Sequence, residues 1–381
     1  MKNTLSRVIA YSAIAVLTFP TPASSRAAIP FPLAAIGQPK PQWHLDYLRT
    51  SEAHSLSRGS GTVIAVVDTG VAPHPDLQRN LLTGIDLTAD HSPSGQRDSD
   101  GHGTAMAGLI AANGGPSTRG AAGVAPDAEV LPVRAKIKNS EGDVADLVSG
   151  VEFAVSAGVD VISISAAAPA DAEVQRAIKL AQQSDIVVVA AAGNTTSSSN
   201  VEYPAREPGV IAVGGIDRQG NHADISVTGP EIDVVAPAVD IYSTGLNKGY
   251  RVGTGTSDAT AIVAGAAALI RSKYPNLPAQ EVAHRLTATA VDKGPPGRDD
   301  QYGYGVIDLV AALTADVPPL GFESSNVTPP ASAEAAPDKS DDGSATVRGL
   351  ATLGVLVAAG GGYLFWRRRR RADDPPPRVS R

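Results

Sequence analysis

The middle of the chain contains five short runs that are apolar almost throughout. They cover residues 62–68, 160–165, 186–192, 210–214 and 232–236. Unbroken apolar runs are typical of parallel strands covered on both faces, because a half-exposed strand would alternate apolar and polar positions. Helical patterns lie at 145–157 and 172–183, before and after the second run. Strands that alternate with helices in this way predict an α/β fold built on a parallel sheet.

The N-terminal residues have the three parts of a secretory signal peptide. Lys2 and Arg7 give a positive start, an apolar run covers 8–19, and small residues and prolines continue to Ala28. The apolar run is too short to span a bilayer, and a buried helix is the alternative interpretation. We therefore expect residues 1–28 to direct export of the chain.

A second uncharged stretch lies near the other end, at 349–366. Aromatic residues gather at its C-terminal edge, as they do at membrane interfaces, and five arginines follow directly at 367–371. The positive-inside rule then keeps the tail 367–381 in the cytoplasm. The pattern predicts a single transmembrane helix that anchors an extracellular body to the cell membrane. A core helix and a cleaved sorting tail are the alternatives, but no cell-wall anchoring motif precedes the span.

Three segments lie between the predicted signal peptide and the predicted span. Residues 61–314 carry the strand and helix signals and are expected to form the folded body. Residues 29–60 precede this body, either as an extension wrapped around it or as a short pro-segment. Residues 315–348 are rich in Pro, Ser, Ala and Asp. Such a composition buries too little apolar area to offset chain entropy, which predicts a flexible stalk.

Charge and cysteine content exclude several classes of function. The formal net charge is −7, and positive residues gather at both ends, so the body between them is more acidic than the whole chain. An acidic body argues against nucleic acid as a partner, since that interface needs clustered positive charge. The chain has no cysteine. Disulfide scaffolds, thiol catalysis and cysteine-bound metals are therefore excluded.

Four polar residues lie in glycine-containing frames at the ends of predicted elements. They are Asp68, His102, Asn194 and Ser257. Reactive groups gather at the carboxyl ends of parallel strands, so we expect these side chains to meet. Together they supply what serine nucleophilic catalysis needs: an orienting carboxylate, a base, an oxyanion donor and a nucleophile.

Each of these residues also has a plainer interpretation when taken singly. A serine in a Gly/Thr turn is usually a helix cap, and an asparagine after glycine is usually a turn residue. The frame Asp68-Thr69-Gly70 also occurs in aspartic proteases, which use two carboxylates. That alternative needs an all-β body or a homodimer, and the alternation of strands and helices argues against it.

The order and frames of these residues resemble the subtilisin-like serine protease family. Three blocks carry the resemblance: residues 62–77 around Asp68, residues 100–108 around His102, and residues 255–265 around Ser257. The resemblance implies a mainly parallel seven-stranded sheet with helices on both faces. It also implies that Asp68 orients His102, that His102 acts as base and then acid, that Ser257 attacks, and that Asn194 donates to the oxyanion. No metal or cofactor is expected.

The same resemblance implies where a peptide substrate binds. The segment 163–167 matches the family strand beside its main specificity pocket, so Ser163, Ser165, Ala166 and Ala167 are expected to bind substrate. Two alanines stand where the family has leucine and glycine. A narrower pocket is the expected consequence.

The serine block departs from the family at Asp258, where the family has methionine or phenylalanine. Ala261 also replaces a proline. A carboxylate after the nucleophile is interpreted first as a helix cap. The alternative is that Asp258 tunes the charge of the site, because a nearby carboxylate stabilises an imidazolium.

The order of segments along the chain resembles the mycosins. These are membrane-anchored subtilisin-like proteases associated with type VII secretion in actinobacteria, and they carry disulfides that this cysteine-free chain lacks. The resemblance implies an exported, membrane-anchored serine endopeptidase that acts on protein or peptide substrates and is associated with that secretion machinery. The alternative is a largely non-proteolytic scaffold that stabilises a membrane secretion complex.

Overall fold

The computed structural model describes residues 42–114, 120–138 and 141–321. The chain divides into two compact units, Met1–Glu323 and Ser324–Arg381, and all described residues belong to the first. All helices and strands named below therefore belong to this first unit.

Several predicted segments lie outside the described residues. They are the signal peptide 1–28, most of the stalk 315–348, the membrane span 349–366 and the tail 367–381. Among the described residues, no helix has the length and apolar character needed to cross a membrane.

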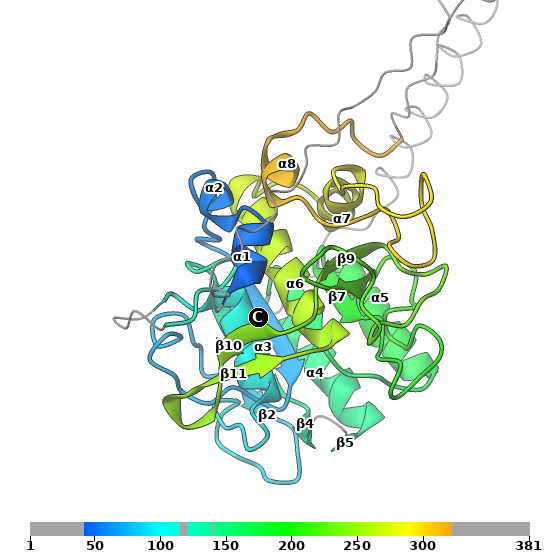
Figure 1. The fold of residues 1–381 in the computed structure, drawn as a ribbon. Coiled ribbons are helices and arrows are strands. Elements are labelled where there is room, and N and C mark those ends of the chain that lie inside the picture. The colour runs from blue at the N-terminus through cyan, green and yellow to red at the C-terminus, as the bar shows by residue number, and fades with distance from the viewer. Residues whose placement is uncertain (1–41, 115–119, 139–140, 322–381) are drawn as a thin grey trace, which may run out of the picture. The chain divides into compact units, whose positions relative to one another are not determined.

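A seven-stranded parallel sheet forms the centre of the unit, as the sequence predicts (Figure 1). Its strand order is β2-β3-β1-β6-β7-β8-β9. The strands are β1 (Val63–Asp68), β2 (Ile85–Asp86), β3 (Glu129–Arg134), β6 (Val161–Ile164), β7 (Val187–Ala191), β8 (Ile211–Ile216) and β9 (Val234–Pro237). Two antiparallel hairpin-like pairs lie outside it: β4 (Lys136–Lys138) with β5 (Glu141–Gly142), and β10 (Ile241–Thr244) with β11 (Tyr250–Gly253).

Helices cover both faces of this sheet. The long α6 (Thr256–Lys273) packs on β6, β7, β8 and β9, and α3 (His102–Ala111) packs beside it on β1 and β3. The opposite face carries α4 (Val144–Ser156) and α5 (Ala172–Gln183), which pack on each other. The remaining described helices are α1 (Trp43–Tyr47), α2 (Thr50–His54), α7 (Ala279–Ala288), α8 (Leu309–Thr314) and the 3₁₀ turn Leu246–Lys248.

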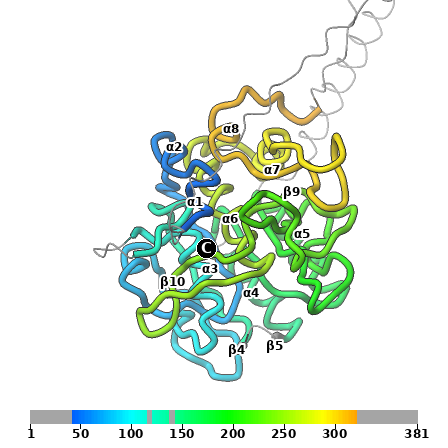
Figure 2. Tube along the Cα trace, viewed as in Figure 1, coloured from blue at the N-terminus to red at the C-terminus, as the bar shows by residue number. Residues whose placement is uncertain are grey.

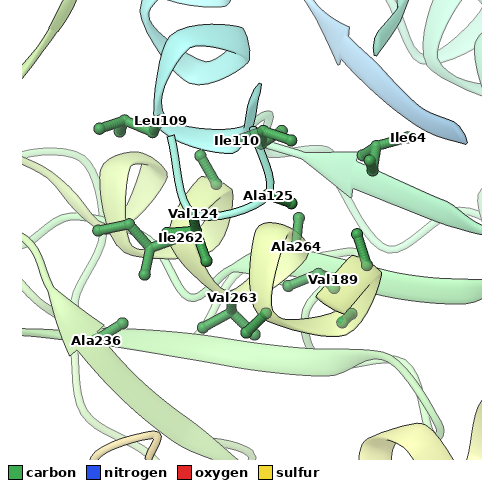
Figure 3. Close-up of a cluster of buried hydrophobic side chains, with 14 of the residues drawn as sticks. Ile64, Leu109, Ile110, Val124, Ala125, Val189, Ala236, Ile262, Val263 and Ala264 are labelled. Atoms are coloured by element: carbon green, nitrogen blue, oxygen red, sulfur yellow. The ribbon is translucent and has the colours of Figure 1, made fainter. Parts of the chain in front are cut away.

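Small side chains allow α3 and α6 to pack closely between the sheet and the rest of the core. Every residue of α3 is buried, as is nearly every residue of α6. Figure 3 shows Leu109 and Ile110 of α3 in one cluster with Ile262, Val263 and Ala264 of α6. A Cβ added at Gly265 would lie 2.8 Å from the Val124 Cβ, so glycine is needed for this contact. A helix that is apolar on all sides is stable only when it is buried on all sides. These two helices, which carry His102 and Ser257, are therefore rigidly held.

The first described residues wrap onto the body. Figure 2 shows the blue N-terminal segment beside the orange segment that contains α8, and α2 contacts α8. Arg49 Nη2 binds both carboxylate oxygens of Asp308, at 2.7 Å and 2.8 Å. The Trp43 indole donates to the backbone carbonyl oxygens of Val239 and Asp240. In its described part, the predicted extension 29–60 is thus an integral layer of the fold.

Two strands of the sheet, β2 and β3, are not evident from the apolar pattern. The β3 sequence begins with Glu129, ends with Arg134 and contains Pro132 in its middle. Proline is rare inside a sheet because it cannot donate a ladder hydrogen bond. This interruption hides a central strand that lies directly beside β1.

Candidate active site

Asp68 and His102, which the sequence analysis pairs, are hydrogen-bonded to each other. Asp68 is the last residue of β1, and His102 is the first residue of α3, which packs on that strand. The His102 Nδ1 donates to the two carboxylate oxygens of Asp68, at 2.8 Å and 2.9 Å. Asp68 is 1% exposed and His102 is 5% exposed. A proton held on Nδ1 leaves the other ring nitrogen, Nε2, able to accept one.

The surroundings of Asp68 keep its carboxylate ionised despite its burial. Burial alone raises the pKa of Asp68, but the charges of His102 and Lys136, together with hydrogen bonds from His102 and the Thr69 backbone, lower it to about 2. The Thr69 N–H donates to Asp68 Oδ1 at 2.7 Å. A carboxylate that stays ionised stabilises a positive charge that forms on the neighbouring ring.

Glycines and an aspartate in the preceding loop set the position of His102. Gly101 has a φ of 93°, in the left-handed region that glycine adopts without steric cost. A Cβ at Gly103 would lie 2.1 Å from the Gly70 carbonyl oxygen, so only glycine lets α3 approach the end of β1 so closely. Asp98 Oδ1 accepts the Gly101 N–H at 2.8 Å. The glycine-flanked frame is therefore a packing requirement of the histidine's position.

Asn194 and Ser257 come together at the start of α6. Ser257 is in the first turn of this helix, and Asn194 follows β7. The Asn194 Oδ1 accepts hydrogen bonds from the backbone N–H and the hydroxyl of Thr256, at 3.0 Å and 3.2 Å. Because its carbonyl oxygen is held in this way, the side-chain amide nitrogen of Asn194 is left to donate. Within the first turn of α6, the Thr256 N–H is bound to Asn194 and the Asp258 N–H to the Gly255 carbonyl oxygen, so among the described residues the Ser257 N–H is left to donate.

Ser257 and His102 lie on helices that pack against each other. The next residue, Asp258, interacts electrostatically with both His102 and Asp68, so the start of α6 reaches the imidazole. Ser257 is 8% exposed, and within the described part of the chain its hydroxyl makes no hydrogen bond. Hydrogen bonds between a nucleophile and its base often tighten only when substrate binds. The serine hydroxyl is therefore unengaged in the first turn of a helix that packs on the helix bearing His102.

Asp258 does not cap α6, which corrects the interpretation that its sequence position favours. The N-cap is Gly255, and the side chain that binds the first backbone N–H of the helix, that of Thr256, is Asn194. Asp258 is instead 3% exposed, and its Oδ1 has no hydrogen-bond partner among the described residues. Burial raises the pKa of Asp258 to about 6, against the lowering effect of the charges of His102 and Arg251. The chain thus buries a second carboxylate near the imidazole, and this one titrates close to neutral pH.

Sequence reasoning misses a buried lysine that contacts this site. Lys136, the first residue of β4, is 4% exposed. Its Nζ lies 3.7 Å from Asp68 Oδ1 and donates to the Ser165 carbonyl oxygen at 2.7 Å. A lysine is almost never fully buried unless it is paired. The available signal was a charged pair of positions, Arg134 and Lys136, at the end of an apolar segment.

Arg134, the last residue of β3, supports the same end of β1. It is fully buried, and its guanidinium binds the carboxylates of Asp86 and Asp90 at 2.7 Å each. Its Nε donates to the Thr69 carbonyl oxygen at 3.3 Å. Because Thr69 follows Asp68, this buried cation fixes the backbone on which the carboxylate stands.

The residues predicted to bind substrate lie at the end of β6. Ser163 is within the strand, and Ser165, Ala166 and Ala167 follow it. Both serine hydroxyls are buried without a hydrogen-bond partner among the described residues. A cavity of about 40 Å³ adjoins this segment, and its wall includes Ala166, Ala167 and Lys136 but neither serine. The structure therefore brings the two alanines, and the unpredicted lysine, to one hollow near the Asp68–His102 pair.

Comparison with known proteins gives the family. Residues 59–305 match the family model for the subtilase family. Thermostable alkaline protease of Halalkalibacterium halodurans is 37% identical over 267 residues, which are 70% of this chain and 71% of that protein. Mycosin-1 of Mycobacterium tuberculosis is 35% identical over 358 residues and covers 79% of each chain.

Solved structures agree with these relatives. The crystal structure of MycP1 with its N-terminal propeptide removed has a TM-score of 0.64 at 32% identity, and the match covers 73% of this chain and 99% of that one. The MycP3 protease from the type VII (ESX-3) secretion system has a TM-score of 0.62 at 33% identity, over 75% of this chain and 91% of that one. The chain therefore belongs to the subtilase family of serine endopeptidases and is a mycosin-like member of it.

Proposed function

We propose that this chain is an exported, membrane-anchored serine endopeptidase that hydrolyses protein or peptide substrates through an acyl-enzyme on Ser257. The observation that carries the proposal is the buried His102–Asp68 pair, bonded at 2.8 Å and packed against the helix that bears the serine. The similar MycP3 protease is described as part of a type VII secretion system. We extend that association to this chain.

In the proposed reaction, His102 takes the proton of Ser257 as the hydroxyl attacks the scissile carbonyl carbon, and then gives it to the leaving amine. Asp68 holds the ring tautomer and stabilises the imidazolium. The Asn194 amide and the Ser257 backbone N–H donate to the oxyanion of the tetrahedral intermediate. These roles are those established for subtilisin, and family membership supports their transfer to the matching residues.

The substrate is proposed to lie extended along the end of β6. Backbone hydrogen bonds to an added strand give affinity, while neighbouring hollows select side chains. Ser163, Ser165, Ala166 and Ala167 are the residues that we assign to this contact. The small cavity walled by the two alanines supports a compact side chain at that position.

The anchor rests on the sequence, since residues 349–366 and the arginines that follow lie outside the described part of the chain. An uncharged stretch of this length, followed by five arginines, supports a single span with the peptidase on the outer side. The localisation that follows is the cell membrane, with the active site facing outward.

One experiment tests chemistry and anchoring together. Membranes from cells that express the full chain are treated with a fluorophosphonate probe, which labels an activated serine. The wild type should be labelled in the membrane fraction, and Ser257→Ala should not. Asn194→Ala should fold and still be labelled, but its peptide turnover should fall by about 10²–10³-fold, the loss known for the oxyanion asparagine of subtilisin.

Two results would contradict the proposal. Wild-type labelling of the Ser257→Ala variant would remove this serine from the reaction. A wild type that is correctly folded, unlabelled and inactive on diverse peptides would favour the scaffold alternative instead.

A further inference from the structure

The site contains one cation and one anion more than its proposed chemistry needs. Asp68, His102 and Ser257 suffice for acyl transfer, yet Lys136 and Asp258 are buried around them, 4% and 3% exposed. Burying a charge is costly unless it is paired, so such groups persist only where something compensates them. Their placement relative to the imidazole suggests what they do.

Lys136 acts on the pair from the strand side. Its Nζ is 3.7 Å from Asp68 Oδ1, the same oxygen that accepts from His102 Nδ1 at 2.8 Å. It also donates to the Ser165 carbonyl oxygen, which locks the ammonium between the ends of β1 and β6. A fixed positive charge here stabilises the ionised Asp68. It also opposes a second positive charge on the ring of His102.

Asp258 acts on the pair from the helix side, with the opposite sign. It follows the serine in α6, and its Oδ1 has no hydrogen-bond partner among the described residues. The carboxylate hydrogen-bonds its own backbone N–H and interacts electrostatically with His102, and a negative charge near the ring favours the imidazolium. Arg251, which is partly exposed, opposes the burial effect on Asp258 less than His102 does.

We propose that Lys136 and Asp258 are opposed positioning charges, and that their balance sets the pH at which His102 becomes available as the base. The inference rests on the proposed role of His102 and deepens it. Two further carboxylates, Asp98 and Asp100, lie in the loop before α3 and bind backbone N–H groups of the 100–104 turn. Those carboxylates are common to every variant below and do not affect the comparison.

The test is a charge-removal cycle read on the imidazole and on turnover. The variants are Lys136→Met, Lys136→Gln, Asp258→Asn and the double variant Lys136→Met/Asp258→Asn, each in the full chain. The ring protons of His102 are titrated by NMR, and the acid limb of the kcat/KM profile is measured in parallel. Lys179→Met, on the exposed side of α5, removes the same charge from a solvated position and serves as the matched control.

Removing the lysine charge should let the imidazole protonate at higher pH, so the midpoint and the acid limb should both rise by roughly one pH unit. Asp258→Asn should move them down, and the double variant should return them close to the wild type. The glutamine variant keeps a donor for the Ser165 carbonyl, so it separates the charge from the packing. Lys179→Met should move neither reading.

Two outcomes would overturn the inference. The first is a His102 midpoint that is the same in wild type, Lys136→Gln and Asp258→Asn, and the second is a shift in the same direction for both substitutions. The NMR reading does not require activity. An inactive wild type with the expected midpoints would therefore count against the proposed function while leaving the charge balance standing.

Discussion

Two carboxylates interact with His102: Asp68 at the end of β1 and Asp258 in the first turn of α6. Both are almost completely buried. Asp68 is 1% exposed and Asp258 is 3% exposed. Nevertheless, the pKa of Asp68 is lowered to about 2, whereas that of Asp258 is raised to about 6. The two differ in their partners. Asp68 has a histidine, a lysine and a backbone N–H within reach, whereas Asp258 Oδ1 has no hydrogen-bond partner among the described residues.

The comparison separates two uses of a buried acid. A carboxylate at the end of a parallel strand meets side chains and backbone donors from neighbouring strands, and these keep it ionised. The carboxylate of Asp258, inside the first turn of a buried helix, has its own backbone N–H as hydrogen-bond donor and only the charges of His102 and Arg251 to favour its ionised form. Its charge is then weakly supported, so its protonation can change near neutral pH.

The largest expected effect is on turnover. Asp68→Asn should lower kcat by about 10⁴-fold, as removal of the matching aspartate does in subtilisin, because the imidazole loses its orienting acceptor. Asp258→Asn should lower kcat by less than about tenfold at pH 8, since it removes no reacting group. Peptide hydrolysis by both variants, with circular dichroism to confirm folding, checks the contrast. Equal losses in the two variants would show that both carboxylates orient the base.

On the Asp68 side of this comparison, the sequence predicts the surrounding strand and helix and the pairing of Asp68 with His102. Asp68, His102, Asn194 and Ser257 are each recognisable because chain turns beside them demand glycine, and because each stands at the end of a clear element. The strand and helix boundaries around them agree with the structure within a few residues. Such local signals can be read from the sequence alone, because they depend only on residues that are neighbours in the chain.

The roles of Lys136 and Asp258 could not be predicted from the sequence. Lys136 reaches Asp68 only because β3 lies beside β1 in the sheet, and Pro132 makes β3 hard to recognise as a strand. Asp258 looks like a helix cap, since aspartate is a preferred capping residue. Its actual role depends on Gly255 occupying the N-cap and on α6 being buried on all sides. Both residues owe their character to contacts between distant segments.

The next largest effect is on the free energy of unfolding. Removing the charge of Asp258 and removing the charge of Asp68 should change it in opposite directions. A carboxyl whose folded pKa is raised to about 6 binds its proton more tightly in the folded state, so stability falls as pH rises from about 4 to 6. Asp258→Asn should therefore raise the free energy of unfolding by on the order of 3 kcal/mol at pH 7 and by less than about 1 kcal/mol at pH 4. Urea unfolding in a Ser257→Ala background, which prevents self-digestion, measures both values.

Asp68→Asn should do the reverse in the same background. The folded pKa of Asp68 is depressed, so its contribution is present above about pH 4 and is lost only as the pH falls toward 2. Removing that charge should destabilise the protein at pH 7. Stabilisation by both substitutions would mean that Lys136 and His102 do not compensate the buried charge of Asp68.

The smallest expected effect comes from a buried group with no compensation at all. His44, in α1, is fully buried, and neither ring nitrogen has a hydrogen-bond partner among the described residues. Burial lowers the pKa of His44 to about 3. Below about pH 6.5, His44 therefore binds a proton in the unfolded chain but not in the folded protein, and the free energy of unfolding falls as the pH drops.

That loss should reach about 2 kcal/mol at pH 5, and His44→Leu should abolish it while keeping the side chain apolar and of similar size. The free energy of unfolding, measured between pH 7 and pH 5 in the Ser257→Ala background, gives the slope directly. His284→Leu is the matched control, because His284 lies near the surface and bonds the Pro318 carbonyl oxygen. If the unfolding free energy of His44→Leu depends on pH as steeply as that of the wild type, His44 gains a hydrogen-bond partner or reaches water on acidification. His44 would then resemble Asp68, whose buried charge is compensated by partners.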